Sequence, residues 1–126
     1  MSDLFHSAEP IYLQLAERIK RQIIRGELHL GEKLPSVRDM GLKVNVNPNT
    51  VQRTYRELEE LKIVKSKRGI GTFVTDDEYI LQTIREQMKE TKISHFVQGM
   101  REMGYANDEI QAGLKSYLAE KGASEQ

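Results

Sequence analysis

The sequence predicts a mainly α-helical protein with one small β-hairpin: an N-terminal domain of three helices and the hairpin, followed by a C-terminal helical hairpin. Three observations predict this fold class. Apolar residues recur every three to four positions over most of the 126 residues, which is the spacing of amphipathic helices. One short stretch instead carries β-favouring residues around a glycine-rich turn. Hydrophobic residues are 38% and charged residues 30% of the chain, so a modest core with a well-solvated surface is expected.

The first helix is predicted over about residues 10–25. Pro10 favours a helix start, because the N–H that proline lacks would be unpaired in the first turn. The apolar stripe that follows repeats every four residues, at Ile11, Leu15, Ile19 and Ile23. Gly26 is typical of a helix end.

A short second helix is predicted after Ser36. The Ser36 hydroxyl can cap this helix, with Asp39 three residues later as the partner in a capping box. Glycine is unfavourable in mid-helix, so Gly41 indicates a close approach of another helix. Asn45 follows and tolerates the left-handed conformation that a tight turn needs.

A third helix is predicted over about residues 47–61, with Asn47 as its N-cap and Pro48 in the first helical position. Its inward stripe is Val51, Tyr55 and Leu58, so Tyr55 is interpreted as a core residue rather than a stacking platform. Its outward stripe is polar and comprises Asn49, Gln52, Arg53 and Arg56. The spacing of Arg56 allows either a phosphate contact or an ion pair with Glu60.

The β-hairpin is predicted over about residues 63–75. Its turn contains Gly69 and Gly71, and the returning strand is rich in β-favouring residues. The tip is basic, with Lys65, Lys67 and Arg68. Basic side chains and small glycines together would let this hairpin approach a phosphate backbone or a minor groove.

Helix, short helix, tight turn, helix and hairpin in this order make a winged helix-turn-helix, which we assign to residues 1–75. The second helix of such a pair fits the DNA major groove, where Asn or Gln can pair adenine and Arg can pair guanine. Residues 1–75 hold 13 basic against 9 acidic side chains, whereas residues 76–126 hold 6 against 10. This asymmetry has two explanations of equal weight: a nucleic-acid partner for the basic part, or sampling noise in the surface charge.

Residues 76–126 are predicted to form a helical dimerisation tail. A long helix over about residues 77–103, whose apolar stripe changes phase near residues 91–94, ends at Gly104, and Asn107 caps a second helix. The long helix carries more apolar surface than the short one can cover, which favours contact with a second copy over a small-molecule pocket. The predicted dimerisation residues are Ile80, Leu81, Ile84, Met88, Phe96, Met100 and Met103.

The segment from Pro10 to Val74 resembles the DNA-binding domain of GntR-family bacterial transcription regulators. The motifs PIYLQL, G-x-L-x-x-G-x-x-LPS-x-R, N-P-N-T-V, Y-R-E-L and R-G-x-G-T-F-V occur in order and in register. The resemblance implies that Arg38 contacts DNA, that the start of the third helix reads the major groove, and that Arg68 with Gly69 enters the minor groove. The DNA-binding residues expected from the residue pattern and the resemblance are Ser36, Arg38, Asn47, Asn49, Thr50, Gln52, Arg53, Lys67, Arg68 and Gly69.

Two positions depart from the usual pattern of the family. Gly41 stands where alanine is usual and Asn45 where glycine is frequent, yet both keep the small side chain or the left-handed tolerance that the turn needs. The short tail is similar to that of the YtrA-like subfamily, in which it mainly makes the dimer. That likeness implies a homodimeric repressor of a nearby operon, often one encoding a transporter, bound to a palindromic operator in double-stranded DNA.

Other function classes find little support in the sequence. Cysteine is absent, and the three histidines lack the spacing of a helical metal site, so no metal, cofactor or catalytic centre is expected. The first residues lack a signal-peptide pattern and no stretch is apolar enough to span a membrane, so a cytoplasmic location is expected. The rival hypotheses are a winged helix that binds protein instead of DNA, and a regulator that also senses a small-molecule effector.

Overall fold

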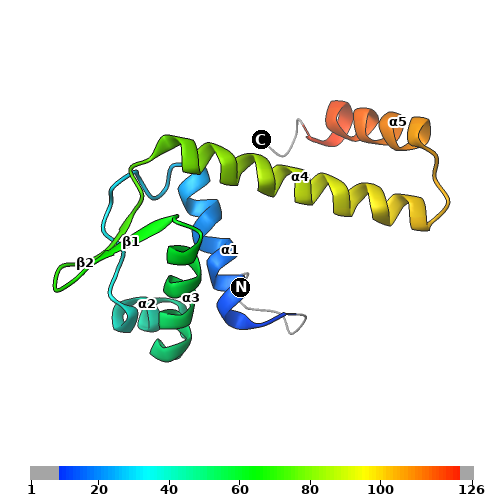
Figure 1. Ribbon diagram of the computed structural model, residues 1–126. Coiled ribbons are helices and arrows are strands. Elements are labelled where there is room, and N and C mark those ends of the chain that lie inside the picture. Colours follow the sequence, from blue (N-terminus) through cyan, green and yellow to red (C-terminus); the bar gives the residue numbers. More distant parts are fainter. Residues whose placement is uncertain (1–8, 123–126) are drawn as a thin grey trace. The chain divides into compact units, whose positions relative to one another are not determined.

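The computed structural model of the protein describes residues 9–122. These residues form five α-helices, one short π-helix and a two-stranded antiparallel sheet (Figure 1). The predicted fold class, mainly α-helical with a small β-hairpin, is therefore confirmed. The chain divides into two compact units between Arg85 and Glu86, and helix α4, Glu78–Glu102, runs from the first unit into the second.

The first unit is built around α3, Pro48–Glu60, which contacts α1, Ile11–Ile24, on one side and α2, Val37–Val44, on another (Figure 1). The side chains of the common core are almost fully buried, and the largest are Leu15, Ile19, Val51, Leu58 and Ile63. Their burial supplies the main stabilisation of the unit, since removing apolar surface from water is the dominant favourable term in folding. The helical periodicity of the sequence identified all three helices.

Helix α1 begins one residue later than predicted. Pro10 precedes the helix in an extended conformation, with φ −59° and ψ 142°. Its carbonyl accepts hydrogen bonds from the N–H groups of Leu13 and Gln14, at 3.1 and 3.2 Å. Proline suits this position because it needs no N–H there.

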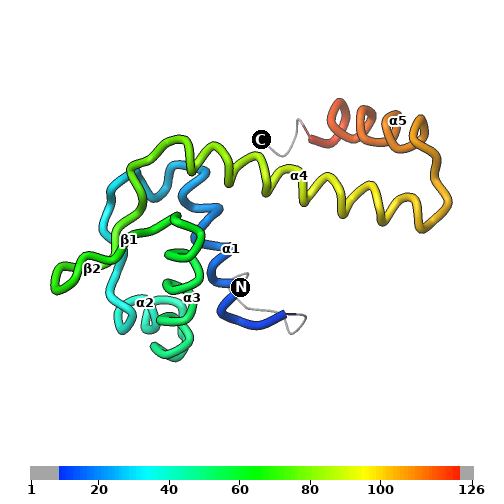
Figure 2. The backbone as a smooth tube through the Cα atoms, in the orientation of Figure 1, coloured from blue at the N-terminus to red at the C-terminus, as the bar shows by residue number. Residues whose placement is uncertain are grey.

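Strands β1, Val64–Lys67, and β2, Gly71–Val74, pair with Val64 opposite Val74 and Lys67 opposite Gly71. The connection between α1 and α2 runs along the free edge of β2 (Figure 2). Leu34 N–H donates to the Thr72 carbonyl and Val74 N–H donates to the Glu32 carbonyl, both at 2.8 Å. The sequence predicted only a turn-rich link here, because a single bridge of this kind leaves no alternating pattern.

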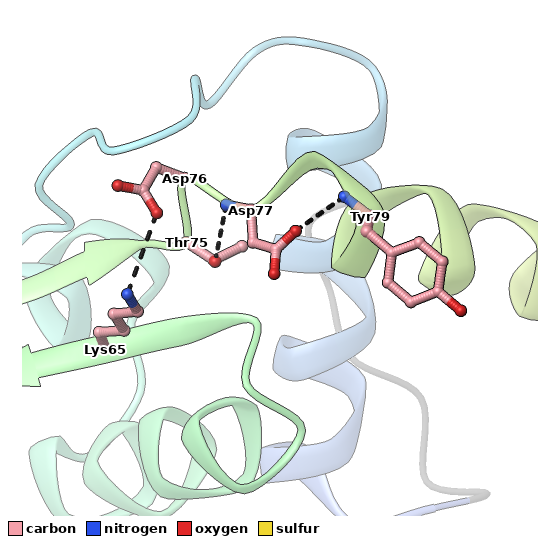
Figure 3. Close-up of polar contacts among 5 residues, drawn as sticks. All are labelled: Lys65, Thr75, Asp76, Asp77 and Tyr79. Atoms are coloured by element: carbon pink, nitrogen blue, oxygen red, sulfur yellow. Dashed lines mark hydrogen bonds and ion pairs between the residues drawn. The ribbon is translucent and has the colours of Figure 1, made fainter.

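The start of α4 belongs to the first unit. Asp77 N–H donates to the Thr75 hydroxyl at 3.1 Å, and the Asp77 carboxylate accepts from Tyr79 N–H at 3.0 Å, which caps the helix (Figure 3). Ile84 is only 9% exposed, and the Arg85 guanidinium donates to the carbonyl of Ile24 at 3.4 Å. The first two turns of α4 are thus attached to the end of α1.

The second unit contains the rest of α4, then α5, Asn107–Tyr117, and the π-helix η1, Leu118–Gly122. Helix α4 continues without a break through residues 91–94. The prediction that Asn107 caps α5 is wrong, because Asn107 is the first helical residue and its side chain accepts from Arg101 at 2.9 Å. The Glu109 carboxylate instead accepts from the N–H of Ala106, at 2.8 Å.

Much of the apolar surface in the second unit has no cover within the described chain. Ile110 is buried, as its place in the predicted stripe of α5 suggests. Further apolar side chains of this unit are exposed, namely Ile93, Phe96, Met103, Tyr105, Leu114, Tyr117 and Leu118. The two helices therefore leave part of their apolar faces uncovered. The surplus of apolar residues in the sequence had indicated this.

Candidate nucleic-acid interface

The turn between α2 and α3 is as tight as the sequence predicts. Asn45 adopts the left-handed conformation, with φ 59° and ψ 52°, and Val46 N–H donates to the Gly41 carbonyl at 2.9 Å. A β-carbon at position 41 would lie 2.6 Å from the carbonyl oxygen of Val46 and 3.6 Å from Cγ of Pro48. Glycine is therefore required by the close approach of the turn and the start of α3.

The N-terminus of α3 is exposed to solvent. The Asn47 side chain accepts from the N–H of Asn49 at 2.7 Å, and Pro48 occupies the first helical position, as predicted. Asn49 and Gln52 are exposed and Thr50 is half-buried. The positive end of a helix dipole and these hydrogen-bonding side chains suit contact with DNA.

The opposite face of α3 fixes its position on the domain. Tyr55 is buried and its hydroxyl donates to the carbonyl of Pro35 at 2.7 Å, so its predicted place in the core is confirmed. Burial raises the pKa of Tyr55 to about 12. Thr54 is also buried, and its hydroxyl donates to the carbonyl of Tyr12 at 2.9 Å. These two hydrogen bonds join α3 to the start of α2 and to the first turn of α1.

Helix α2 contributes a second row of polar side chains. The Ser36 hydroxyl accepts from Asp39 N–H at 3.1 Å, which caps α2 as predicted. Arg38 is exposed and shares a shallow hollow of about 340 Å³ with Asn45 and Asn47. The fold thus brings together predicted site residues from α2 and from the start of α3.

The hairpin of β1 and β2, residues 64–74, is the wing of this domain, and its turn is closed by contacts within the hairpin. Arg68 and Gly69 form its turn, closed by the Ile70 N–H, which donates to the Lys67 carbonyl at 2.8 Å. Gly69 has φ 77°, a conformation that favours glycine. The Lys67 ammonium lies 4.8 Å from the centre of the Phe73 ring.

A groove of about 790 Å³ joins the three elements. Ser36 from α2, Gln52 and Arg56 from α3, and Ser66 and Ile70 from the hairpin all line it. Five residues from separate segments therefore face one concave surface.

The groove itself is lined by cations and carboxylates alike, namely Lys33, Lys43 and Arg56 with Glu27, Glu32, Asp39 and Glu59. Four further cations of α2, α3 and the hairpin lie outside this lining and form no ion pair within residues 9–122. Within residues 9–122, Lys20, Arg25, Lys65 and Lys89 each lie within 4.0 Å of a carboxylate, whereas Arg38, Arg53, Lys67 and Arg68 do not. In the same part of the chain no ion pair joins Arg56 to Glu60, the alternative that its spacing allowed. Cations without a carboxylate partner can attract phosphate groups.

Among the predicted site residues, Arg53 has an unexpected contact with α1. Its guanidinium lies over the ring of Tyr12, 3.9 Å from the ring centre. The helical pattern placed Arg53 with the outward stripe, but could not indicate that the start of α1 would reach it.

The described residues 9–122 contain no cluster of three or more His, Asp or Glu side chains arranged to hold a metal ion. In the same part of the chain, no helix is both long and apolar enough to cross a membrane.

Comparison with known proteins agrees with this geometry. Residues 11–74 match the family described as bacterial regulatory proteins, gntR family. The chain belongs to the GntR family. It is a transcriptional regulator with a DNA-binding domain and not an enzyme, as its residue pattern predicts.

Similarity extends through the tail. YhcF, an HTH-type transcriptional regulator of Bacillus subtilis, is 42% identical over 93% of this chain and 97% of its own length. YtrA, an HTH-type transcriptional repressor of the same organism, is 35% identical over 75% of this chain and 77% of its own length. These relatives support the assignment of this GntR-family regulator to the YtrA-like subfamily.

Solved structures support the GntR family and the winged-helix fold. A GntR-family transcriptional regulator from Listeria monocytogenes matches with a TM-score of 0.84 and 34% identity, over 89% of this chain and 98% of its own. The DNA-binding domain of AraR in complex with operator ORX1 matches with a TM-score of 0.54 and 26% identity, over 57% of this chain and 93% of its own. The winged helix of this GntR-family regulator thus has the fold of a domain solved on DNA.

Three features of the surface were missed by the sequence analysis. The bridge from Lys33 to Phe73 adds a third extended segment beside the wing. Leu42 is 78% exposed beside Arg38, although its leucine side chain suggested no surface role. Tyr12 on α1 contacts Arg53 on α3. The sequence could have indicated this contact only if an aromatic stacking partner had been sought for each arginine.

Proposed function

We propose that this regulator is a homodimeric, sequence-specific repressor that binds a palindromic operator in double-stranded DNA. The observation that carries the proposal is that α2, α3 and the wing meet at one groove, and that Arg38, Lys67 and Arg68 on these elements form no ion pair within residues 9–122. Arg38 and the start of α3 would contact the major groove, and Arg68 with Gly69 the minor groove. A cytoplasmic location follows from the need to reach chromosomal DNA.

Each predicted DNA-binding residue has a role that its position supports. Exposed Asn49 and Gln52 carry the donor and acceptor pairs that suit adenine, and Arg38 carries a fork that suits guanine or a phosphate. Asn47 and Ser36 stand at helix starts, where backbone N–H groups favour anions. Thr50 is half-buried and has a shorter reach, so it would contact DNA only at the closest approach of α3.

The homodimer is supported by the apolar surface of the second unit. Phe96 is 42% and Met103 67% exposed, and both lie on α4. Leu118 on η1, which is 59% exposed, extends this surface beyond the residues that the sequence predicted. Ile84 is covered within the first unit, so the proposed interface uses the later part of the α4 stripe.

Dimerisation would place two copies of α3, the proposed recognition helix, on one operator. A two-fold dimer of helix-turn-helix domains usually binds half-sites whose centres are roughly 34–36 Å apart. Linking the two domains raises affinity, because binding of one half-site holds the second domain at high local concentration. Repression is supported by the name of the relative YtrA, and control of a nearby operon, including a transporter operon, by the subfamily likeness.

Selection of bound duplexes from a random double-stranded DNA pool tests the proposal. A two-fold symmetric consensus is expected, and sedimentation of the complex should give two chains per duplex. The consensus placed across a reporter promoter should then lower transcription when the regulator is expressed. Failure to enrich any sequence would favour the rival hypothesis, a winged helix that binds protein.

The rival hypothesis that the regulator also senses a small-molecule effector has its own test. Thermal unfolding of the dimer–operator complex against a metabolite panel would detect a ligand that shifts the operator affinity.

A further inference from the structure

We propose that Tyr12 positions Arg53 as a phosphate clamp at the edge of the recognition helix, so that Arg53 holds the DNA backbone and does not read a base. This inference rests on the proposed DNA binding and assigns a different role to one of its residues. It also gives a function to the first turn of α1, which the groove does not include.

The geometry of the pair supports a fixed position for the guanidinium. The Arg53 guanidinium carbon lies 3.9 Å from the centre of the Tyr12 ring. A planar guanidinium on an aromatic face is attracted by the ring quadrupole and keeps its N–H edges free to donate in its own plane. The stacked side chain can therefore bind a phosphate oxygen without leaving the ring.

The backbone that carries the ring is held in place by α3. The carbonyl of Tyr12 accepts from the hydroxyl of Thr54, which is fully buried, at 2.9 Å. Tyr12 is half-buried beside it. Because Thr54 follows Arg53 directly, the backbone of Tyr12 and the side chain of Arg53 are tied to the same turn of α3.

The direction of Arg53 separates it from the base-reading side chains. Gln52 and Arg56 line the groove that α3 shares with the wing, whereas Arg53 does not line it and turns towards α1. A helix in the major groove has base edges before its centre and phosphate ridges along its two sides. A guanidinium drawn to the α1 side therefore meets a ridge.

The charge of Arg53 is available for this contact. Among residues 9–122 no carboxylate lies within ion-pair distance of its guanidinium. The ring positions the charge without neutralising it. Holding the side chain before binding also lowers the entropy that is lost when the contact forms.

The experiment compares binding to two fluorescent duplexes, one with the selected operator and one of random sequence, over a series of salt concentrations. Arg53→Ala is expected to weaken binding to both duplexes alike. The slope of log K against log salt should fall by about 0.9 for each bound domain, because one phosphate contact is lost. Between about 50 and 200 mM salt, this makes the loss of affinity roughly threefold smaller per domain.

Variants of Tyr12 test the positioning role. Tyr12→Leu keeps the backbone carbonyl that Thr54 uses but removes the ring, and should weaken binding to both duplexes. Tyr12→Phe keeps the ring and should match the wild type. In the Arg53→Ala background, Tyr12→Leu should have no additional effect on binding, since the side chain that it positions is gone.

Two further variants keep the test decisive. Lys92→Ala removes one exposed charge from the second unit and should leave the salt slope unchanged. Arg53→Lys keeps the charge on a surface position, so it remains informative if Tyr12→Leu does not fold, and it should keep the salt slope with weaker binding.

Four results would overturn the inference. A loss confined to the operator, with the random duplex and the slope unchanged, would make Arg53 a base reader. Wild-type binding by Tyr12→Leu would show that Tyr12 does not position Arg53. If Tyr12→Leu changed the thermal unfolding but not the DNA binding, the pair would be only a packing contact. An Arg53→Lys variant that binds as tightly as the wild type would also exclude the stacked clamp. Absence of wild-type binding to either duplex would instead refute the proposed function itself.

Discussion

The carboxylate of Glu59 on α3 accepts two hydrogen bonds from Ser66 on the wing, from its N–H at 3.4 Å and from its hydroxyl at 3.2 Å. No other side-chain hydrogen bond within residues 9–122 joins the recognition helix to the hairpin. Besides backbone and apolar contacts, the two elements that would enter adjacent DNA grooves are thus linked by one exposed carboxylate.

This link predicts that Glu59→Ala weakens operator binding, although it removes a negative charge from a DNA-binding surface. Glu60→Ala is the matched control, because it removes the same charge from the next, exposed residue of α3. Titration of labelled operator should give weaker binding for Glu59→Ala than for Glu60→Ala. Equal or tighter binding by Glu59→Ala would show that the wing does not need this anchor.

A second prediction concerns Arg38. Arg38→Ala should lower operator affinity by about 1–3 kcal/mol if its guanidinium makes a bidentate contact with a base. Its side chain is exposed, so the free energy of unfolding should stay within about 0.5 kcal/mol of the wild type. Lys89→Ala on α4 removes a charge elsewhere and serves as the control, and an operator affinity equal to that of this control would exclude Arg38 from the interface.

The wing should contribute to binding at every DNA sequence. The double variant of Lys67→Ala and Arg68→Ala should weaken binding to operator and random duplexes together. Each lost phosphate contact should reduce the log–log salt slope by about 0.9. A slope equal to that of the wild type would mean that the hairpin stays off the DNA.

Charged substitutions in the second unit should separate the proposed dimer. Phe96→Asp with Met103→Asp introduces two charges into an exposed apolar surface and should give a monomer by light scattering. Operator binding should then be at least about tenfold weaker, because the linked second domain is lost. Thr91→Asp with Ser94→Asp places the same charge at exposed polar positions of α4, and should leave the dimer intact. A dimeric Phe96 and Met103 double variant would exclude this surface as the interface.

Tyr55 should make stability depend on alkaline pH. The folded-state pKa of about 12 is above the ordinary value of 10.0, so the stabilisation is fully present below pH 10.0. It is lost as the pH rises through the folded pKa, and the free energy of unfolding falls between these values. Tyr55→Phe should remove this part of the pH dependence and, by losing the hydrogen bond to Pro35, cost about 1 kcal/mol at neutral pH. Identical urea midpoints for both proteins from pH 9 to 12 would contradict the assignment.

The sequence by itself determined the helices of the first unit, the turn and the hairpin. Their signals are local: the period of the apolar residues, the cap at Asn47, the left-handed Asn45 and the glycines of the wing act within a few residues of one another. Such interactions need no distant partner, so a reader of the sequence can recover them. The small residue at position 41 even indicated a close contact before its partner, the turn at Val46, was known.

Only the tertiary structure decided which side chains of a helix contact which other element. Arg53 stacks on Tyr12, 41 positions earlier. Ile84 is covered within the first unit, whereas Phe96, another predicted dimerisation residue of the same helix, is exposed. The segment 31–34 becomes an edge of the sheet only because Thr72 and Val74 of β2 offer it backbone hydrogen-bonding groups. Periodicity specifies which face of an element is apolar or charged, but the contacts of that face depend on elements far away in the sequence, and only folding brings them together.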